Sequence, residues 1–204
     1  MSMNRTDVPS RRRSRAQMTE GTTRRLVAAA RRAFARDGYA GASMDALCRD
    51  AGVTRGALYH HFGGKDGLLE AVVRDIDAGL GERLGREAAR HADPWEGFLA
   101  CCRCWLEQAL DPEMQRIVLR DAPAVLGQRL RELDEASWIA PLRDTLDALM
   151  ATGRIRSTDP EALARLVNGA LVDAALWVAA ADDPRETLGR ALGAVETLLS
   201  GLAR

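Results

Sequence analysis

Apolar residues recur at every third and fourth position along most of the chain, which is the spacing at which side chains share one face of a helix. The first such segment begins at Thr19, a residue suited to cap a helix, and stops at Asp37-Gly38. Aromatic residues form only 4% of the chain, and runs of β-branched residues are missing. Since Ala, Leu and Arg dominate and favour helix, the sequence predicts an all-α protein.

Two short helical patterns follow the first one. The earlier begins at Ser43, carries apolar residues at helical spacing and ends at Gly52. A three-residue turn, Gly52-Val53-Thr54, separates it from the segment RGALYHHF, which Gly63-Gly64 ends. Two short helices joined by a glycine turn predict a helix-turn-helix.

The remaining patterns are longer and suit one larger helical domain. Four Asp-Pro pairs, with glycines, divide them, and each pair suits an N-cap followed by proline in the first helical position. The expected helices are 65–80, 94–110, 112–126, 128–151, 160–181 and 184–202. We therefore expect a three-helix domain that contains the helix-turn-helix over 19–64 and a larger helical domain over 65–204.

The formal net charge of zero conceals an uneven distribution. Residues 1–62 carry twelve arginines against five acidic residues, a balance of +7, so the rest of the chain carries −7. Because phosphate neutralisation supplies much of the affinity for nucleic acids, a basic first third is typical of a DNA-binding end. Residues 1–18 lack apolar periodicity and predict a disordered basic arm.

The second helix of a helix-turn-helix lies in the major groove, and its outward residues reach bases and phosphates. Leu58 and Phe62 are four residues apart and are expected to pack inward with Val53. Arg55 can pair with guanine through two hydrogen bonds, and Gly56 allows the backbone to approach the DNA closely. The residues left on the outward side are Thr54, Arg55, Gly56, Tyr59 and His60.

The stretch from Phe34 to Leu69 resembles the DNA-binding domain of the TetR (tetracycline-repressor) family. The similarity includes the aromatic-glycine corner, the glycine turn, the G-x-L-Y-x-H-F helix and the K-x-x-L-L opening of the next helix. Lys65 opposes the dipole at its helix start, which favours a phosphate role over a stabilising one. We expect His61 to pack within the domain. The resemblance implies DNA contacts by Ser43, Met44, Thr54, Arg55, Gly56, Tyr59, His60 and Lys65.

The last two helices are more apolar than one core face requires. The resemblance implies that they pair with a second copy as a four-helix bundle, giving a homodimer on a twofold-symmetric operator. The alternative is that these faces form only the chain's own core. The expected interface residues are Leu163, Leu166, Val167, Ala170, Leu171, Ala174, Trp177, Leu188, Leu192, Val195 and Leu199.

The resemblance also implies a small-molecule effector, of unknown identity, bound among the middle helices. Large apolar side chains at helical spacing also occur in ordinary cores, so both interpretations remain open. Asp121 stands in an otherwise apolar-faced segment, where it could hold a cationic ligand or cap the helix near Pro123. The candidate pocket residues are Trp95, Phe98, Trp105, Asp121 and Trp138.

Three cysteines lie close together as Cys101, Cys102 and Cys104. They suit buried small hydrophobic side chains better than a zinc site, because no further ligands recur nearby. No nucleotide loop, metal-ligand pair or nucleophile-base constellation is found, so we expect no enzyme, no metal and no cofactor. No stretch resembles a membrane span or a secretory signal, and we expect a cytoplasmic protein.

These patterns predict a sequence-specific transcriptional regulator, a repressor that a small molecule releases from a palindromic operator. One alternative is a redox-responsive regulator that uses the cysteines. Another is a basic-armed helical adaptor without specific DNA binding.

Overall fold

The computed structural model describes residues 15–203, with side chains from residue 20 onward. Helix α1 (Arg15–Gly41) begins before the expected start at Thr19. The prediction of a disordered arm is therefore corrected for residues 15–18, and the rest of that arm lies outside the described residues. Gly38 interrupts α1 with φ 71° and ψ 169°, where the sequence predicted the helix to stop.

The predicted helix-turn-helix consists of α2 (Met44–Ala51) and α3 (Arg55–Phe62). Ser43 caps α2 and Thr54 caps α3. Gly52 ends α2 in the left-handed conformation, with φ 65° and ψ 42°. Each short helix is thus started by a side-chain cap and ended by a glycine, as the sequence indicated.

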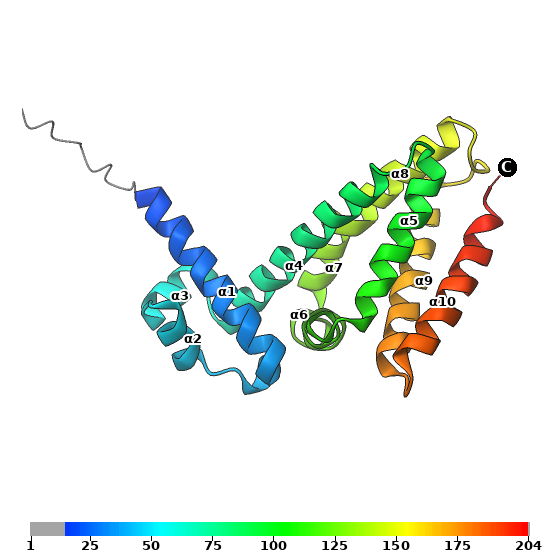
Figure 1. Ribbon diagram of the computed structural model, residues 1–204. Helices are drawn as coiled ribbons and strands as arrows, with labels where there is room; N and C mark the ends of the chain where they lie inside the picture. Colours follow the sequence, from blue (N-terminus) through cyan, green and yellow to red (C-terminus); the bar gives the residue numbers. More distant parts are fainter. Residues whose placement is uncertain (1–14, 204) are drawn as a thin grey trace, which may run out of the picture.

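The body is built from longer helices. Helix α4 extends eight residues beyond its predicted end. It is one continuous helix from the head, which α1, α2 and α3 form, to the far end of the body (Figure 1). Two of the other predicted helices contain π-helical turns, η2 and η3, which are wider than an α-helix. The elements are α4 (Lys65–Ala88), α5 (Pro94–Leu106), the 3₁₀ turn η1 (Glu107–Leu110), η2 (Met114–Asp121), α6 (Ala122–Leu126), α7 (Gln128–Asp134), η3 (Glu135–Ile139), α8 (Ala140–Ala151), α9 (Pro160–Ala180) and α10 (Pro184–Ser200).

The Asp-Pro pairs act as predicted. The Asp93, Asp159 and Asp183 side chains accept hydrogen bonds from backbone amides in the first turns of α5, α9 and α10. Asp111 accepts one from the amide of Glu113 at 2.8 Å. Each carboxylate also lies at the positive end of a helix dipole, so it stabilises the helix start in two ways.

One apolar core joins the head to the body. It contains Phe34 of α1, Leu58 of α3 and Leu69 of α4, and it continues into η2 through Ile117. Two smaller clusters lie among α5, α8, α9 and α10. Because α1, α4 and η2 share one core, a shift of the middle helices can move the head.

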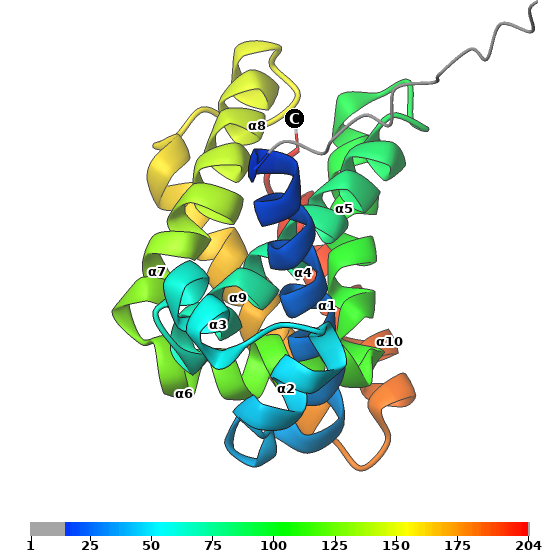
Figure 2. The ribbon, with the colours of Figure 1, turned by 90° about the vertical axis from the view of Figure 1, so that its left-hand side faces the viewer.

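The molecule is all-α, as predicted, and the described residues contain no strand beyond an isolated bridge between Ile155 and Ala203. Figure 1 shows the head of α1, α2 and α3 at one side, with α9 and α10 at the opposite end. In the view turned by 90°, the head stands in front of the body and α4 runs back behind it (Figure 2). Helices α9 and α10 are therefore far from the helix-turn-helix.

Candidate DNA-binding site

The helix-turn-helix presents α3 on the surface of the head. Thr54 Oγ1 accepts a hydrogen bond from the amide of Ala57 at 3.2 Å, which fixes the first turn of α3. Ser43 Oγ does the same for Ala46 in α2 at 3.4 Å. Both hydroxyls stand at helix starts, where the helix dipole also favours a phosphate.

The outward row predicted on α3 is exposed in the structure: Thr54, Arg55, Gly56, Tyr59 and His60 all face solvent. Leu58 is fully buried, and Val53 and Phe62 are partly buried against the same core. Tyr59 leaves 51% of its surface uncovered. A large aromatic side chain on a short exposed helix beside an arginine is suited to contact a second molecule.

The guanidinium of Arg55 is not free in this state. Its NH1 lies 3.4 Å from Oδ1 of Asp45 on α2, and both side chains are more than half exposed. An exposed pair of this kind contributes little to stability. Arg55 can therefore exchange Asp45 for a guanine at small cost, and Asp45 keeps the side chain near the surface that α3 presents.

Gly56 has no intramolecular reason to be glycine. Its φ is not positive, and a Cβ built on it would meet only Thr54 Oγ1 at 3.8 Å. Glycine weakens a helix relative to alanine, so this choice lowers stability without improving the packing. A close approach of this backbone to DNA stays the prediction for Gly56.

Lys65 has a structural role that the sequence argument missed. Its Nζ donates to the carbonyl of Ala40 at 3.3 Å and lies 4.7 Å from the centre of the Tyr39 ring. Burial lowers the pKa of Lys65. These contacts stabilise the corner after α1, which corrects the view that Lys65 is unfavourable for stability alone.

Two further predictions concern the packing of the head. Met44 is half-buried and packs against the core, so only part of its side chain can face DNA. His61 is also half-buried, and its ring lies 5.4 Å from that of His60 and 6.3 Å from that of Phe62. The exposed row on α3 therefore remains the main candidate surface.

Sequence reasoning did not find the polar contacts that tie the head to the body. Arg31 of α1 donates to both carboxylate oxygens of Glu113, at 2.9 Å and 2.6 Å, and to Asp75 Oδ2 at 2.8 Å. Arg116 of η2 donates to the carbonyl of Asp37 at 3.3 Å. Opposite charges such as those of Arg31 and Glu113 are visible in the sequence. Partners so far apart along the chain cannot be paired from the sequence alone.

Asp121 takes part in the same junction. Its Oδ2 accepts a hydrogen bond from the backbone amide of Tyr39 at 2.6 Å. Its side chain makes no cap to α6, which corrects one of the two roles considered for it. Its carboxylate thus serves the junction between head and body.

The other candidate pocket residues lie in or beside the apolar cores. Trp95 and Phe98 are buried together with ring centres 5.5 Å apart. Trp105 packs against all three apolar clusters, and Trp138 donates a hydrogen bond to Asp77. Four cavities around the described residues are lined by other residues, and neither these side chains nor Asp121 contributes to them. Their role in effector binding stays a prediction.

The expected dimer residues divide into three groups. Val167, Leu171, Leu188 and Leu199 are buried in the chain's own core, which corrects their place at an interface. Leu166 and Trp177 are exposed, and two residues outside the expected set, Leu176 and Leu198, are exposed as well. The half-buried members are Leu163, Ala170, Ala174, Leu192 and Val195.

The three cysteines do not form a metal cluster or a disulfide. Cys102 and Cys104 are buried, and Cys101 Sγ donates to the carbonyl of Leu84 at 3.3 Å. Burial raises the pKa of all three thiols, that of Cys102 to about 12. Since the thiolate is the reactive form, these environments suit packing better than redox sensing. Among the described residues, no group of three or more His, Cys, Asp or Glu side chains could hold a metal ion.

Comparison with known families agrees with this geometry at both ends of the chain. The family described as "Bacterial regulatory proteins, tetR family" matches residues 26–72. The family described as "Tetracyclin repressor-like, C-terminal domain" matches residues 95–202, which is more than half of the chain. The chain belongs to the TetR family. It is a helix-turn-helix transcriptional regulator and not an enzyme, as predicted.

Individual relatives give the same result. A TetR-family transcriptional regulator from Pectobacterium atrosepticum is 46% identical, with a TM-score of 0.80 over 94% of this chain and 98% of that one. The HTH-type transcriptional repressor AcnR from Corynebacterium efficiens is 29% identical over 84% of this chain and 89% of its own length. The HTH-type transcriptional regulator UidR from Escherichia coli is 36% identical over 77 residues, 38% of this chain and only about a third (36%) of UidR.

Proposed function

We propose that this TetR-family regulator is a homodimeric repressor that a small molecule releases from a palindromic operator. The observation that carries the proposal is the exposed row on α3, with Arg55 held only by an exposed pair and Gly56 unexplained by packing. The Corynebacterium efficiens relative is named as a repressor. Regulators of this family bind operator DNA and typically dimerise and bind small-molecule ligands.

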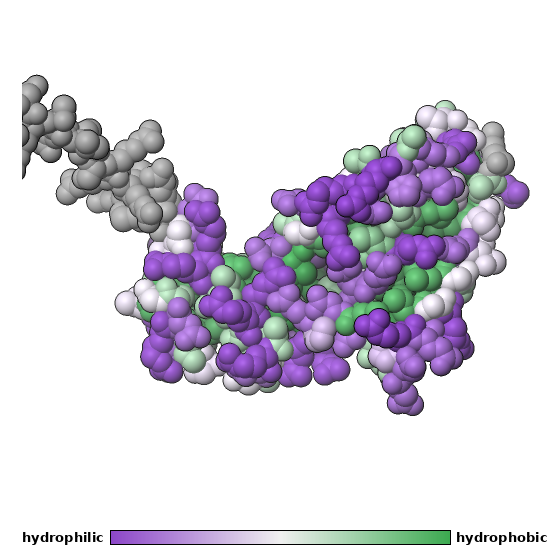
Figure 3. Space-filling model, in the orientation of Figure 1, coloured by the Kyte–Doolittle hydropathy of each residue, from purple (hydrophilic) through white to green (hydrophobic). Residues whose placement is uncertain are grey.

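The apolar side chains left uncovered on α9 and α10 support the homodimer. Leu166 is 72% exposed and Leu198 61%, and Leu176 and Trp177 are each 44% exposed. Apolar side chains also gather over the body beside α10 on the face seen in Figure 3, whereas the head is mostly hydrophilic. A second copy that covers α9 and α10 would bury these side chains and place two heads on one side of the dimer.

Helix α9 also meets the length and composition of a membrane span, and it is the one such helix among the described residues. Only 28% of its most apolar window is buried within the chain. Arg165 of α9, however, pairs with Glu135 at 2.8 Å and with Glu161 at 2.5 Å, which suits a surface that meets water and protein. A second copy is therefore the occupant that we propose, and a DNA target supports a cytoplasmic location.

The proposed release of DNA by an effector depends on the apolar core that the head and the body share. If α1, α4 and η2 move together, a ligand that favours one arrangement of the body also favours one separation of the two heads. The free dimer would fit two successive half-sites of the operator, and the ligand-bound dimer would not.

Selection of bound sequences from random duplex DNA, followed by sequencing, tests the operator. We expect a palindromic consensus with two half-sites. A consensus without symmetry would contradict the dimeric arrangement, and the absence of enrichment would contradict sequence-specific binding.

Substitution at the uncovered face tests the dimer. Leu166→Glu is expected to give monomers by sedimentation, with helix content unchanged because Leu166 makes little contact within its own chain. Ala148→Glu, at an exposed position on α8, is the matched control and should leave the dimer intact. A Leu166→Glu protein that stays dimeric would place the interface elsewhere.

A further inference from the structure

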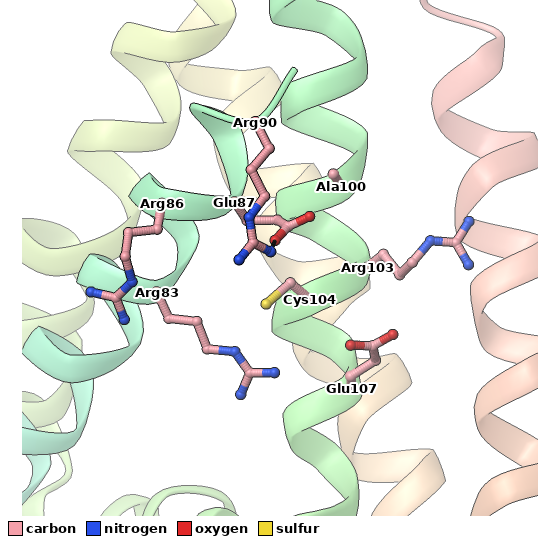
Figure 4. Close-up of a pocket in the computed structure, with 8 residues that line it drawn as sticks. All are labelled: Arg83, Arg86, Glu87, Arg90, Ala100, Arg103, Cys104 and Glu107. Atoms are coloured by element: carbon pink, nitrogen blue, oxygen red, sulfur yellow. Dashed lines mark hydrogen bonds and ion pairs between the residues drawn. The ribbon is translucent and has the colours of Figure 1, made fainter.

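A cavity of about 490 Å³ opens between the C-terminal half of α4 and the helix α5 (Figure 4). Its volume is within the usual range for small-molecule sites. At the top of the groove the two helices are close, because a Cβ on Gly97 would lie 3.1 Å from the carbonyl oxygen of Ala88. Beside α5 the cavity is lined by Ala100, Cys104 and the carboxylate of Glu107, so an apolar patch and one acidic group lie opposite the arginines.

Arginines dominate the α4 wall of this cavity. Arg83 and Arg86 lie three residues apart on one face of α4, and Arg90 follows two residues after the helix ends at Ala88. Figure 4 shows Arg83 and Arg86 on the α4 side, with Arg90 above Glu87. A fourth lining arginine, Arg103 of α5, is directed toward α10, where it pairs with Glu196. Arg103 therefore lies at the rim of the cavity.

Arg83, Arg86 and Arg90 differ in how well nearby carboxylates neutralise them. Arg90 pairs with Glu87 at 2.5 Å, whereas Arg86 lies 3.7 Å from Glu82 in an exposed contact. Arg83 donates to the amide oxygen of Gln108 at 3.0 Å and has no carboxylate within ion-pair distance among the described residues. Arg83 therefore has no acidic partner at the cavity, and Arg86 has only a long and exposed one.

The like charges of Arg83 and Arg86 are only partly offset by the nearby Glu82 and Glu87. Like charges one helical turn apart repel each other, and they lower helix stability by as much as opposite charges raise it. An acidic molecule in the cavity would remove the repulsion and accept hydrogen bonds from both guanidinium groups. Planar guanidinium groups suit carboxylates and phosphates, since they can donate two parallel hydrogen bonds.

We propose that this α4–α5 cavity binds a small molecule with two or more acid groups, held by Arg83 and Arg86. The proposal rests on the proposed function, because it makes this anion the effector of the repressor. It differs from the sequence-based expectation, which placed the effector among tryptophans and allowed a cation at Asp121.

A physical route leads from this cavity to the head. Arg83 also lines a neighbouring cavity of about 180 Å³, and Arg31, Gln108 and Glu113 line it too. The Arg31–Glu113 pair is one of the contacts that hold α1 against the body. An anion that draws Arg83 away from Gln108 alters the wall next to that pair.

Calorimetric titration of the full-length protein without DNA, at fixed ionic strength, tests the site. The probes are citrate and inorganic pyrophosphate, which represent carboxylate and phosphate ligands. We expect one of them to bind with a stoichiometry of one per chain. Arg83→Gln and Arg86→Gln should each weaken that binding by about tenfold or more. Which probe binds more tightly assigns the ligand to carboxylates or to phosphates.

Arg74→Gln is the matched control. Arg74 lies on the same helix, pairs with Glu70 four residues earlier as Arg86 does with Glu82, and lies outside the cavity. It removes the same charge and should leave probe binding unchanged. Equal losses in all three variants would show general charge attraction and overturn the proposal. So would the absence of binding by both probes.

A stability measurement separates a binding role from a structural one. In the absence of probe, Arg83→Gln should unfold at the same temperature as the unaltered protein or higher, because the substitution relieves repulsion. A clear loss of stability would instead make Arg83 a structural residue. Addition of the probe to the protein–operator complex should then release the DNA. Because the titration contains no DNA, its failure leaves the operator selection intact, and a failed selection leaves the titration intact.

Discussion

The backbone amide of Tyr39 donates a 2.6 Å hydrogen bond to Oδ2 of Asp121, a residue 82 positions later in the chain. Tyr39 follows the break in α1 at Gly38, and Asp121 ends the π-helical turn η2. A Cβ on Gly38 would overlap the guanidinium of Arg116, which donates to the carbonyl of Asp37. The end of α1 and the middle of the body are thus joined by hydrogen bonds between side chains of η2 and backbone groups of α1.

Asp121→Ala should therefore weaken the junction. The Asp121 side chain is only 16% exposed, so its loss leaves the Tyr39 amide without an acceptor in a poorly hydrated place. We expect the free energy of unfolding to fall by about 1 to 3 kcal/mol, measured by urea denaturation. Asp121→Asn keeps an acceptor oxygen and should lose less. Equal losses in the two variants would mean that the charge next to Arg116 matters more than the hydrogen bond.

Gly56→Ala should separate stability from DNA binding. The added Cβ has free space within the protein, and alanine favours helix, so the free energy of unfolding should rise by up to about 1 kcal/mol. Binding to the selected operator should fall at least about tenfold, because the Cβ would stand between α3 and the DNA. Gly81→Ala, at an exposed and open position on α4, should stabilise without affecting DNA binding. Unchanged operator affinity in Gly56→Ala would exclude close approach of the backbone at this position.

Much of the fold could be predicted from the sequence because its signals are local. The caps at Ser43, Thr54 and the Asp-Pro pairs act within one helical turn, and Gly52 marks its turn by its own conformation. The π-helical turns η2 and η3 were not predicted, since they change how a helix winds without changing the spacing of its apolar residues enough to be noticed.

The candidate sites show a second limit. Leu166 and Val167 are neighbours on α9, yet Leu166 is exposed and Val167 is buried. An apolar pattern shows that a face must be covered, but not whether the chain or a second copy covers it. The Asp121–Tyr39 contact could not be predicted either. One partner is a backbone amide, which every residue except proline has, so the side-chain pattern does not indicate it.

Arg55→Ala and Lys65→Ala should have different effects on DNA binding. Arg55→Ala is expected to cost about 1 to 3 kcal/mol of binding free energy and to relax specificity at one base pair. Lys65→Ala should weaken binding to all sequences alike and should also lower stability, because Lys65 contacts Ala40 and the Tyr39 ring. Binding to a set of single-base operator variants measures both effects. Identical profiles for the two variants would contradict this division of roles.

Asp45→Asn offers an independent check of the Arg55 role. The Asp45 carboxylate lies 3.4 Å from the Arg55 guanidinium and must give it up when Arg55 reaches a base. Removing that charge should raise operator affinity by a few fold, since exposed pairs of this kind contribute about 1 kcal/mol or less. Asp147→Asn, an exposed position on α8, is the control for net charge. A loss of affinity in Asp45→Asn would indicate that Asp45 positions Arg55 for the DNA.

Asp77 should make stability depend on pH. Its carboxyl group is 6% exposed, accepts a hydrogen bond from Trp138, and leaves Oδ2 without a partner among the described residues. Burial is the main cause that raises the pKa of Asp77 to about 6, and Asp134 raises it further. The folded chain therefore holds this proton more tightly than the unfolded chain, where the pKa is about 3.9.

The stabilising effect of that proton is fully present below pH 4 and is lost as the pH rises through about 6. Asp77→Asn cannot titrate, so its free energy of unfolding relative to the unaltered protein should increase between pH 4 and pH 8, by about 2 kcal/mol. Urea denaturation at several pH values measures this difference, with Asp147→Asn as the control. A difference that stays constant over this range would show that Asp77 titrates at its ordinary pKa and that water reaches its carboxylate.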